Sequence, residues 1–295
     1  MVGLGVSFTD AQWARIEPLL PAATPRRGGR WRDHRLVIDA IAFKYRTGTP
    51  WMDLPERFGS WKGVHNRLRN WAINGTWENV FNTLLAQADA EGDLDWLVAV
   101  DSTVVRAHQH AAGARPKGAP ADEPNDHALG RSRGGLTTKI HLASDSRCRP
   151  LAFVVTPGQA GDAPAFERVM ARIRVPRRVG RPRTTPTGVL ADKAYSSRAI
   201  RGYLRRRGIR AVIPQPADQA ANRKWLGSRG GRPPAFDRDA YKQRNTVERC
   251  INKIKQWRGL ATRYDKTATV YLAALHIAGI FIWSARESEV FRSPL

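Results

Sequence analysis

The chain has 295 residues, enough for one large domain or two smaller ones with a substantial hydrophobic core. Its 49 lysines and arginines against 26 acidic residues give a net charge of +23, which favours an anionic partner, with nucleic acid ahead of an acidic membrane surface. The two cysteines lack the paired spacing of a disulfide framework or a zinc site, and no signal peptide or membrane-spanning stretch is evident. We therefore expect a basic, globular, cytoplasmic protein with no membrane partner.

The first ninety residues are predicted to be all-helical. A helix begins after Thr9 or Asp10, and three short periodic segments at 35–46, 50–58 and 61–72 are separated by Gly and Pro. One apolar stripe of the last segment comprises Trp61, Val64, Leu68, Trp71 and Ala72. The residues that fall away from this stripe are Lys62, His65, Asn66, Arg67 and Arg69.

Three helices with tight turns, the last with a basic outer face, are typical of a helix-turn-helix. The alternative is an ordinary helical bundle with solvated lysines and arginines, and the net charge of +23 favours DNA binding over it. We assign residues 1–92 to a helical, helix-turn-helix-like DNA-binding domain. Its predicted DNA contacts are Lys62, His65, Asn66, Arg67 and Arg69.

From Asp95 the hydrophobic pattern changes from that of helices to that of strands. Residues 96–105 form an apolar, valine-rich run that predicts a buried strand, and 136–145 and 149–158 predict two strands joined by a turn. The remaining elements of 93–295 are a mobile loop at 111–134, a helix from 162, a strand ending at Asp192, a helix from 197, a strand at 209–216, a polar loop to Asp237, and helices at 241–258 and 271–283. This order predicts an α/β fold with a mixed sheet flanked by helices.

Three acids fall at the ends of predicted elements or among basic residues. Asp101 and Asp192 end predicted strands, where sites of α/β sheets gather, and Glu248 lies on the helix 241–258. Together they would form an oxygen cage for Mg²⁺ or Mn²⁺, and two ions about 4 Å apart can drive phosphodiester cleavage. Each acid also has an ordinary explanation: a turn residue for either aspartate, or a surface ion pair for Glu248.

The helix 241–258 carries its acid beside cations. Tyr241, Arg244, Glu248 and Lys255 fall within about 60° of one another at the helical repeat. A neighbouring apolar stripe, which we expect to pack on the sheet, comprises Val247, Ile251 and Ile254. Glu248 would bind metal, while Arg244 and Lys255, on the exposed side of the helix, would hold the phosphates of a DNA strand.

The polar loop before this helix contains two further candidates. Trp225 could stack on a flipped base, although we expect it to pack locally. The string GGRPP at 230–234 is a candidate for contact with the DNA backbone.

Several of these stretches resemble a known signature. DDE transposases of bacterial insertion sequences often carry Tyr, two residues, Arg, three residues, Glu, six residues, Lys, and the chain keeps that spacing from Tyr241 to Lys255. With the runs VAVDSTVVRAHQHAAGA, GRSRGGLTTKIH and VLADKAYSS, nearly the whole chain resembles the fifth insertion-sequence family, within the larger group related to the fourth. The resemblance implies an RNase H-like core over 93–295 and a bacterial, nucleoid-associated location.

The resemblance also implies a chemistry. It implies a triad of Asp101, Asp192 and Glu248 that uses Mg²⁺ or Mn²⁺, with two ions. It implies a homodimer on double-stranded DNA that binds terminal inverted repeats, cleaves the ends with water, and joins the freed 3′-hydroxyl to target DNA. The residues that would contact this DNA are Lys193, Tyr241, Arg244 and Lys255. Two alternatives remain open: a non-catalytic DNA-binding regulator derived from such an enzyme, and a plain nuclease that hydrolyses without joining.

Overall fold

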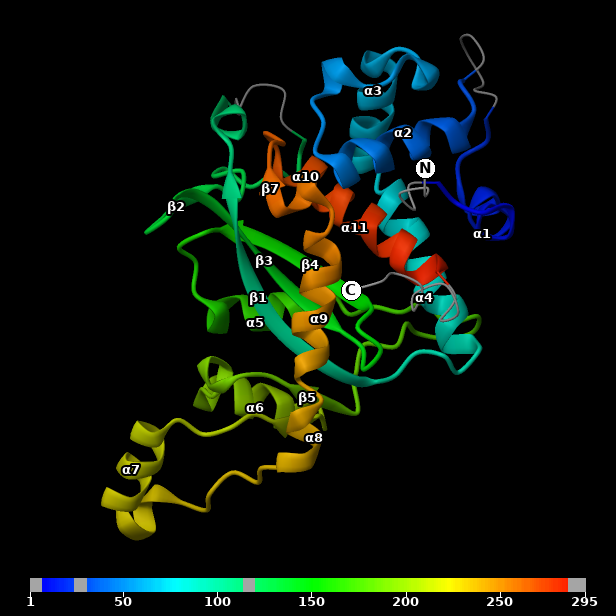
Figure 1. Cartoon of the computed structure of the whole chain (residues 1–295). Coiled ribbons are helices and arrows are strands. Elements are labelled where there is room, and N and C mark those ends of the chain that lie inside the picture. Colours follow the sequence, from blue (N-terminus) through cyan, green and yellow to red (C-terminus); the bar gives the residue numbers. More distant parts are fainter. Residues whose placement is uncertain (1–6, 24–30, 114–119, 286–295) are drawn as a thin grey trace.

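A computed structural model of the chain describes residues 7–23, 31–113 and 120–285 (Figure 1). Within this part, one mixed sheet of seven strands is flanked by helices and preceded by an all-helical region, which confirms the predicted fold class. The strands are β1 Leu97–Ala107, β2 Gly130–Ser132, β3 Gly135–Ser144, β4 Pro150–Pro157, β5 Gly188–Leu190, β6 Arg210–Val212 and β7 Thr262–Arg263.

The long strand β1 lies at the centre of the sheet. On one side it pairs antiparallel with β3 from Ala99 to Arg106, and β3 forms a hairpin with β4. On the other side it pairs parallel with β5, but only through Leu97–Ala99, and β5 is in turn parallel to β6. Further along that same side, β7 pairs parallel with Arg106 and Ala107, so the part of β1 between Ala99 and Arg106 has no strand partner on the β5 side.

Helices cover both faces of this sheet. The α-helices are α1 Asp10–Ile16, α2 His34–Thr47, α3 Trp61–Ile73, α4 Thr76–Ala90, α5 Asp162–Arg172, α6 Arg198–Arg206, α7 Ala217–Trp225, α8 Arg238–Lys242, α9 Asn245–Lys255, α10 Arg258–Ala261 and α11 Ala268–Ser284. Figure 1 shows α9 crossing in front of the sheet, where it packs on β1 and β3, and α5 behind it.

Local sequence explains most of the helix ends. Thr9 begins α1 with a capping box to Gln12, and Gly48, at φ 75°, ends α2 in the left-handed conformation that glycine adopts without strain. The prediction of a helix at 50–58 is wrong: this segment forms two short 3₁₀ turns, each beginning directly after a proline. Proline fixes φ and lacks the N–H that a longer α-helix needs, so the segment turns instead.

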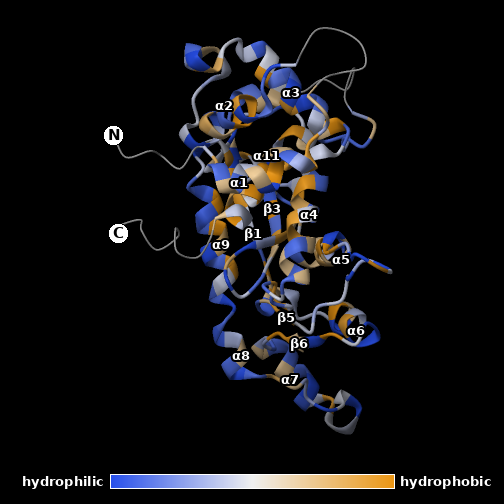
Figure 2. Ribbon diagram, turned by 90° about the vertical axis from the view of Figure 1, so that its right-hand side faces the viewer, coloured by the Kyte–Doolittle hydropathy of each residue, from blue (hydrophilic) through white to orange (hydrophobic). Residues whose placement is uncertain are grey.

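The helix α11 joins the helical region to the sheet. It is apolar on almost all sides and packs against α3, α4 and β4 (Figure 2). The buried side chains of 8–88 and those of the sheet consequently belong to one continuous hydrophobic core. In the described ranges, no helix combines the length and the apolar character needed to cross a membrane.

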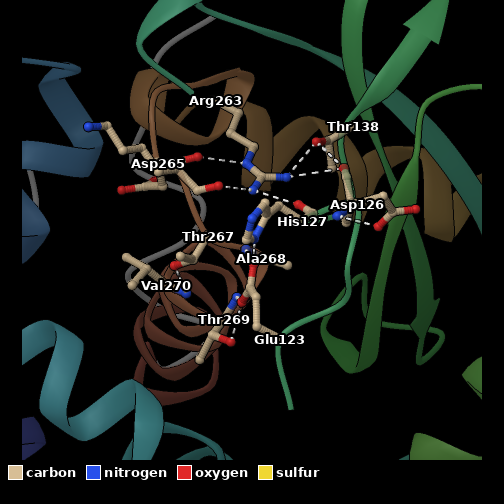
Figure 3. A network of polar contacts seen from close by, with 12 residues as sticks. Glu123, Asp126, His127, Thr138, Arg263, Asp265, Thr267, Ala268, Thr269 and Val270 are labelled. Atoms are coloured by element: carbon tan, nitrogen blue, oxygen red, sulfur yellow. Dashed lines mark hydrogen bonds and ion pairs between the residues drawn. The ribbon is translucent and has the colours of Figure 1, made fainter. Parts of the chain in front are cut away.

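The loop predicted to be mobile at 111–134 is held in place over its described part from 120 onward. Arg263, fully buried, donates hydrogen bonds to the carbonyl oxygens of His127 and Ala128 and to Thr138 Oγ1 of β3 (Figure 3). The Glu123 carboxylate accepts hydrogen bonds from the first backbone N–H groups of α11, at 2.6 and 2.9 Å. Residues 114–119 lie outside the described part.

Candidate active site

Asp101 lies inside β1 and not at the end of a strand as predicted, because β1 continues to Ala107. Its place is nevertheless at the carboxyl end of the parallel part of the sheet, since the pairing with β5 stops at Ala99. Asp101 Oδ1 accepts a hydrogen bond from the backbone N–H of Ser102 at 2.8 Å, which fixes the orientation of the carboxylate.

Asp192 follows β5 by two residues. Its carboxylate accepts a hydrogen bond from Ala194 N at 2.8 Å and caps the short 3₁₀ helix Lys193–Tyr195. The turn role considered for this residue is therefore real, and it places the carboxylate at the same sheet edge as Asp101.

Glu248 lies in the first turn of α9. The single helix predicted at 241–258 is wrong: α8 ends at Lys242, and the chain passes through a tighter turn before α9 begins. Backbone hydrogen bonds three residues apart mark this turn, from Arg244 N to Tyr241 O and from Val247 N to Arg244 O. The predicted apolar stripe is buried as expected and faces the sheet: Val247, Ile251 and Ile254.

Arg244 connects two of the three acids. Its guanidinium donates to Glu248 Oε1 at 2.6 Å and to Asp101 Oδ2 at 3.0 Å. The expectation that Arg244 lies on the exposed side of the helix is wrong, since only 19% of its side chain is exposed. Both terminal nitrogens are engaged by carboxylates, and the positive charge between Asp101 and Glu248 offsets the repulsion of these two acids.

The charges of the other two acids both act on the carboxyl group of Asp101. Burial raises the pKa of Asp101, the hydrogen bond from Ser102 and the charge of Arg244 lower it, and the charges of Asp192 and Glu248 raise it further. No three acidic, histidine or cysteine side chains in the described ranges lie close enough together to hold a metal ion in this arrangement. The donor set still fits a hard cation, because it consists of carboxylate oxygens that repel one another and already hold a guanidinium.

A second group of polar side chains supports the site from the opposite face of β1. Ser102 Oγ donates to Asp162 Oδ1 at 2.6 Å, and Lys139 Nζ donates to the same atom at 3.1 Å. Burial lowers the pKa of His141 to about 4, although Asp162 opposes this shift. The sequence analysis did not identify these residues, but one signal was available. Lys139 and His141 share one face of β3, because they alternate along the strand with apolar residues that point to the other face.

The predicted DNA contacts of α3 fall into two groups. Three are exposed: Lys62, Asn66 and Arg69. His65 instead packs edge-on against Trp51, with ring centroids 5.2 Å apart, and burial lowers its pKa. Arg67 is hydrogen-bonded to His34 Nδ1 at 2.8 Å and lies 4.3 Å from the centre of the Trp31 ring. These two side chains therefore hold the helical region together in this structure.

The other predicted DNA contacts surround the acids. Lys193 is exposed next to Asp192, and Tyr241 and Lys255 are half-buried. Trp225 corrects an expectation: it does not pack locally, because 82% of it is exposed. The predicted polar loop before Asp237 also contains the helix α7, which has no buried residue and therefore no apolar periodicity to reveal it.

Comparisons with known proteins identify the family of the chain. Residues 92–283 match the family described as "Transposase DDE domain", and residues 8–81 match "Putative transposase of IS4/5 family (DUF4096)". The chain therefore belongs to the DDE transposases of the IS4/5 family, as the resemblance implied.

Individual relatives and solved structures resemble different portions of this chain. The uncharacterized protein y4sN of Sinorhizobium fredii is 44% identical over 106 residues, 36% of this chain and 81% of its own length. A putative transposase for insertion sequence element IS6501 of Brucella ovis is 30% identical over 148 residues, 50% of this chain and 98% of its own length. The Mos1 transposase paired-end complex with left transposon end is 15% identical, with a TM-score of 0.24, over 83% of this chain and 86% of that chain.

Proposed function

We propose that this transposase binds the terminal inverted repeats of an insertion sequence, cleaves the DNA at its ends and joins the freed ends to target DNA. The observation that carries the proposal is the guanidinium of Arg244 held between Asp101 and Glu248, with the charge of Asp192 acting on the same buried carboxyl. Two carboxylates that share one guanidinium, with a third acid whose charge acts on one of them, serve phosphodiester chemistry on a chain of net charge +23 better than DNA binding alone.

The acids Asp101, Asp192 and Glu248 would hold Mg²⁺ or Mn²⁺. When bound, two such ions supply an activated water or 3′-hydroxyl and stabilise the leaving oxygen. The chain's own contribution is orientation: the N–H of Ser102 fixes Asp101, and the turn at Ala194 fixes Asp192. Arg244 donates hydrogen bonds to Asp101 and Glu248, so it is placed to contact the phosphate of a strand entering there.

Double-stranded DNA is the proposed partner, bound by a homodimer. The exposed side chains of α3, namely Lys62, Asn66 and Arg69, are the contacts that support recognition by the helical region. This region shares its core with α11 and the sheet, so we expect the full chain, and not a fragment ending near residue 91, to be the unit that binds.

The variant Glu248→Gln tests the triad. It removes one carboxylate but keeps the shape, so we expect end cleavage in Mg²⁺ or Mn²⁺ to fall by more than about 100-fold while binding of the end fragment persists. The matched control is Glu167→Gln, an exposed glutamate on α5, which should cleave at the wild-type rate. Nicking of a labelled end fragment and its gel shift are measured in parallel, and cleavage by Glu248→Gln at the control rate would overturn the triad.

Joining distinguishes a transposase reaction from plain hydrolysis. Pre-cut ends are incubated with a target plasmid and Mg²⁺, and covalent joining of the labelled 3′ end to the plasmid is the expected product. Cleavage without joining would favour a nuclease. Binding without either reaction in both Mg²⁺ and Mn²⁺ would favour a DNA-binding regulator.

A further inference from the structure

A hollow of about 930 Å³ lies beyond the sheet edge that carries the acids. It is formed by α6, by the chain that follows β6, by α7 and by 230–234, and Figure 1 shows α6 beside β5 and α7 below them. We call it the arginine hollow, because no carboxylate is among its described lining residues and six arginines are: Arg198, Arg201, Arg205, Arg206, Arg223 and Arg232.

Hydrogen bonds across the floor of the arginine hollow hold its walls together. Arg201 donates to Ser196 Oγ at 2.9 Å and to the carbonyl oxygen of Ile213 at 2.8 Å. Gln219 of α7 donates to the carbonyl oxygen of Ser196 at 2.7 Å. Gly230 allows the chain to return closely, because a side chain there would meet the backbone oxygen of Arg223 at 2.1 Å. The hollow is therefore a feature built by specific contacts.

The rim of the hollow carries positive charge that the protein does not neutralise. Arg198, Arg205, Arg206 and Arg232 are exposed, and their side chains form no hydrogen bond or ion pair with any residue in the described ranges. Other arginines are paired with acids, as in Arg172 with Glu78 at 3.0 Å and Arg183 with Asp89 at 3.3 Å. Uncompensated guanidinium groups around a hollow bind phosphate oxygens, and several of them at once match a phosphodiester backbone better than a single small anion.

The two ends of the hollow adjoin the candidate active site along the chain. On one side α6 begins six residues after Asp192, and on the other side 230–234 leads through α8 to Arg244. Trp225, the last residue of α7, adds an exposed aromatic ring to this part of the chain. Positive charge that tracks a backbone, combined with an exposed ring, is the combination used to hold nucleic-acid strands.

We propose that the arginine hollow binds the phosphodiester backbone of the DNA strand whose scissile bond lies at the three acids. This inference rests on the proposed function and adds to it a second, separate binding surface. The contacts made there are with phosphates, so they raise affinity and fix the strand without reading its sequence.

The double variant R205A/R206A tests the hollow in the full chain. We expect its affinity for an end duplex, measured without divalent metal, to fall on the order of tenfold, and the slope of log affinity against log salt to fall by about two. The matched control is R177A/R178A, which removes the same charge from an exposed loop outside the hollow. Equal losses in both variants, or no loss in R205A/R206A, would overturn the proposal.

Cross-linking provides a second measurement that removes no arginine. A photoreactive phenylalanine analogue replaces Ala199, which lines the hollow, and in a control chain it replaces Ala171, which is exposed on α5. We expect cross-links to DNA from the first site and not from the second. Loss of cleavage in Glu248→Gln with no cross-link from position 199 would refute the hollow and leave the function standing. Cross-links from position 199 in a chain that keeps the three acids but never cleaves would support the hollow and refute the proposed function.

Discussion

Two regions of this protein use arginine in opposite ways. Where the helical region meets the sheet, Arg263 is fully buried, and its donors are satisfied by carbonyl oxygens and the hydroxyl of Thr138 (Figure 3). In the arginine hollow, Arg205 and Arg206 are exposed, with no acceptor among the described residues. The difference shows that arginines contribute to the net charge of +23 in two ways: an arginine with protein acceptors stabilises the fold, and one without them is available to an anionic ligand.

Arg244 stands between these two cases. It is largely buried like Arg263, but its acceptors are the carboxylates of Asp101 and Glu248, and its Nε has no partner in the described structure. The positive charge of such an arginine stabilises the two carboxylates, and a bound cation could take over that role. The comparison therefore ranks arginines by the acceptors that surround them, and substitution of Arg263 tests that ranking.

The largest effect is expected from Arg263→Met. The change removes all donors at once and leaves buried carbonyl oxygens of His127, Asp265 and Lys266 without partners, which should lower the free energy of unfolding by about 3 kcal/mol or more. Urea unfolding of the full chain measures it. The matched substitution Arg205→Met, in the hollow, should change the same quantity by less than about 0.5 kcal/mol. Similar losses in both variants would contradict the comparison.

A second test concerns a group that the core keeps uncharged. His276 of α11 packs against the rings of Phe81 and Phe153, and burial lowers its pKa to about 4. The unfolded chain takes up this proton near its ordinary pKa of 6.5, whereas the folded chain does so only near 4. Stability from this group is therefore present above pH 6.5 and is lost as the pH falls from 6.5 to 4, by about 3 kcal/mol in total.

The variant His276→Leu isolates this contribution. It should lose less stability than the wild type between pH 6.5 and 4, while unfolding at neutral pH changes little. The wild type also contains His141, whose pKa is lowered in the same direction, so the variant should retain part of the acid sensitivity. Identical pH profiles for the variant and the wild type would mean that the core does not exclude the proton from His276.

Some of this arrangement could be predicted from the sequence. The apolar stripe of α9 and the turn at Asp192 depend on local periodicity and turn chemistry, and both are as expected apart from the break in the helix. Two contacts could not be predicted: the hydrogen bond from Arg244 to Asp101, which joins residues 143 positions apart, and that from Ser102 to Asp162, which joins residues 60 positions apart. Such distant partners meet only in the folded chain. The helix α7 was not predicted, because it buries none of its side chains and so has no apolar periodicity in the sequence.

The smallest effect on stability is expected from Trp225→Ala. An indole that is 82% exposed has little surface to lose on unfolding, so the free energy of unfolding should change by less than about 0.5 kcal/mol. The matched change Trp71→Ala, at a residue only 1% exposed, should cost about 3–5 kcal/mol. Affinity for DNA should respond differently, since an exposed ring beside the arginine hollow can stack on a base, and its loss should weaken binding by about fivefold. Trp225→Ala with wild-type affinity would remove the ring from the DNA-binding surface. A loss of stability comparable with that of Trp71→Ala would place it among the residues that hold the fold.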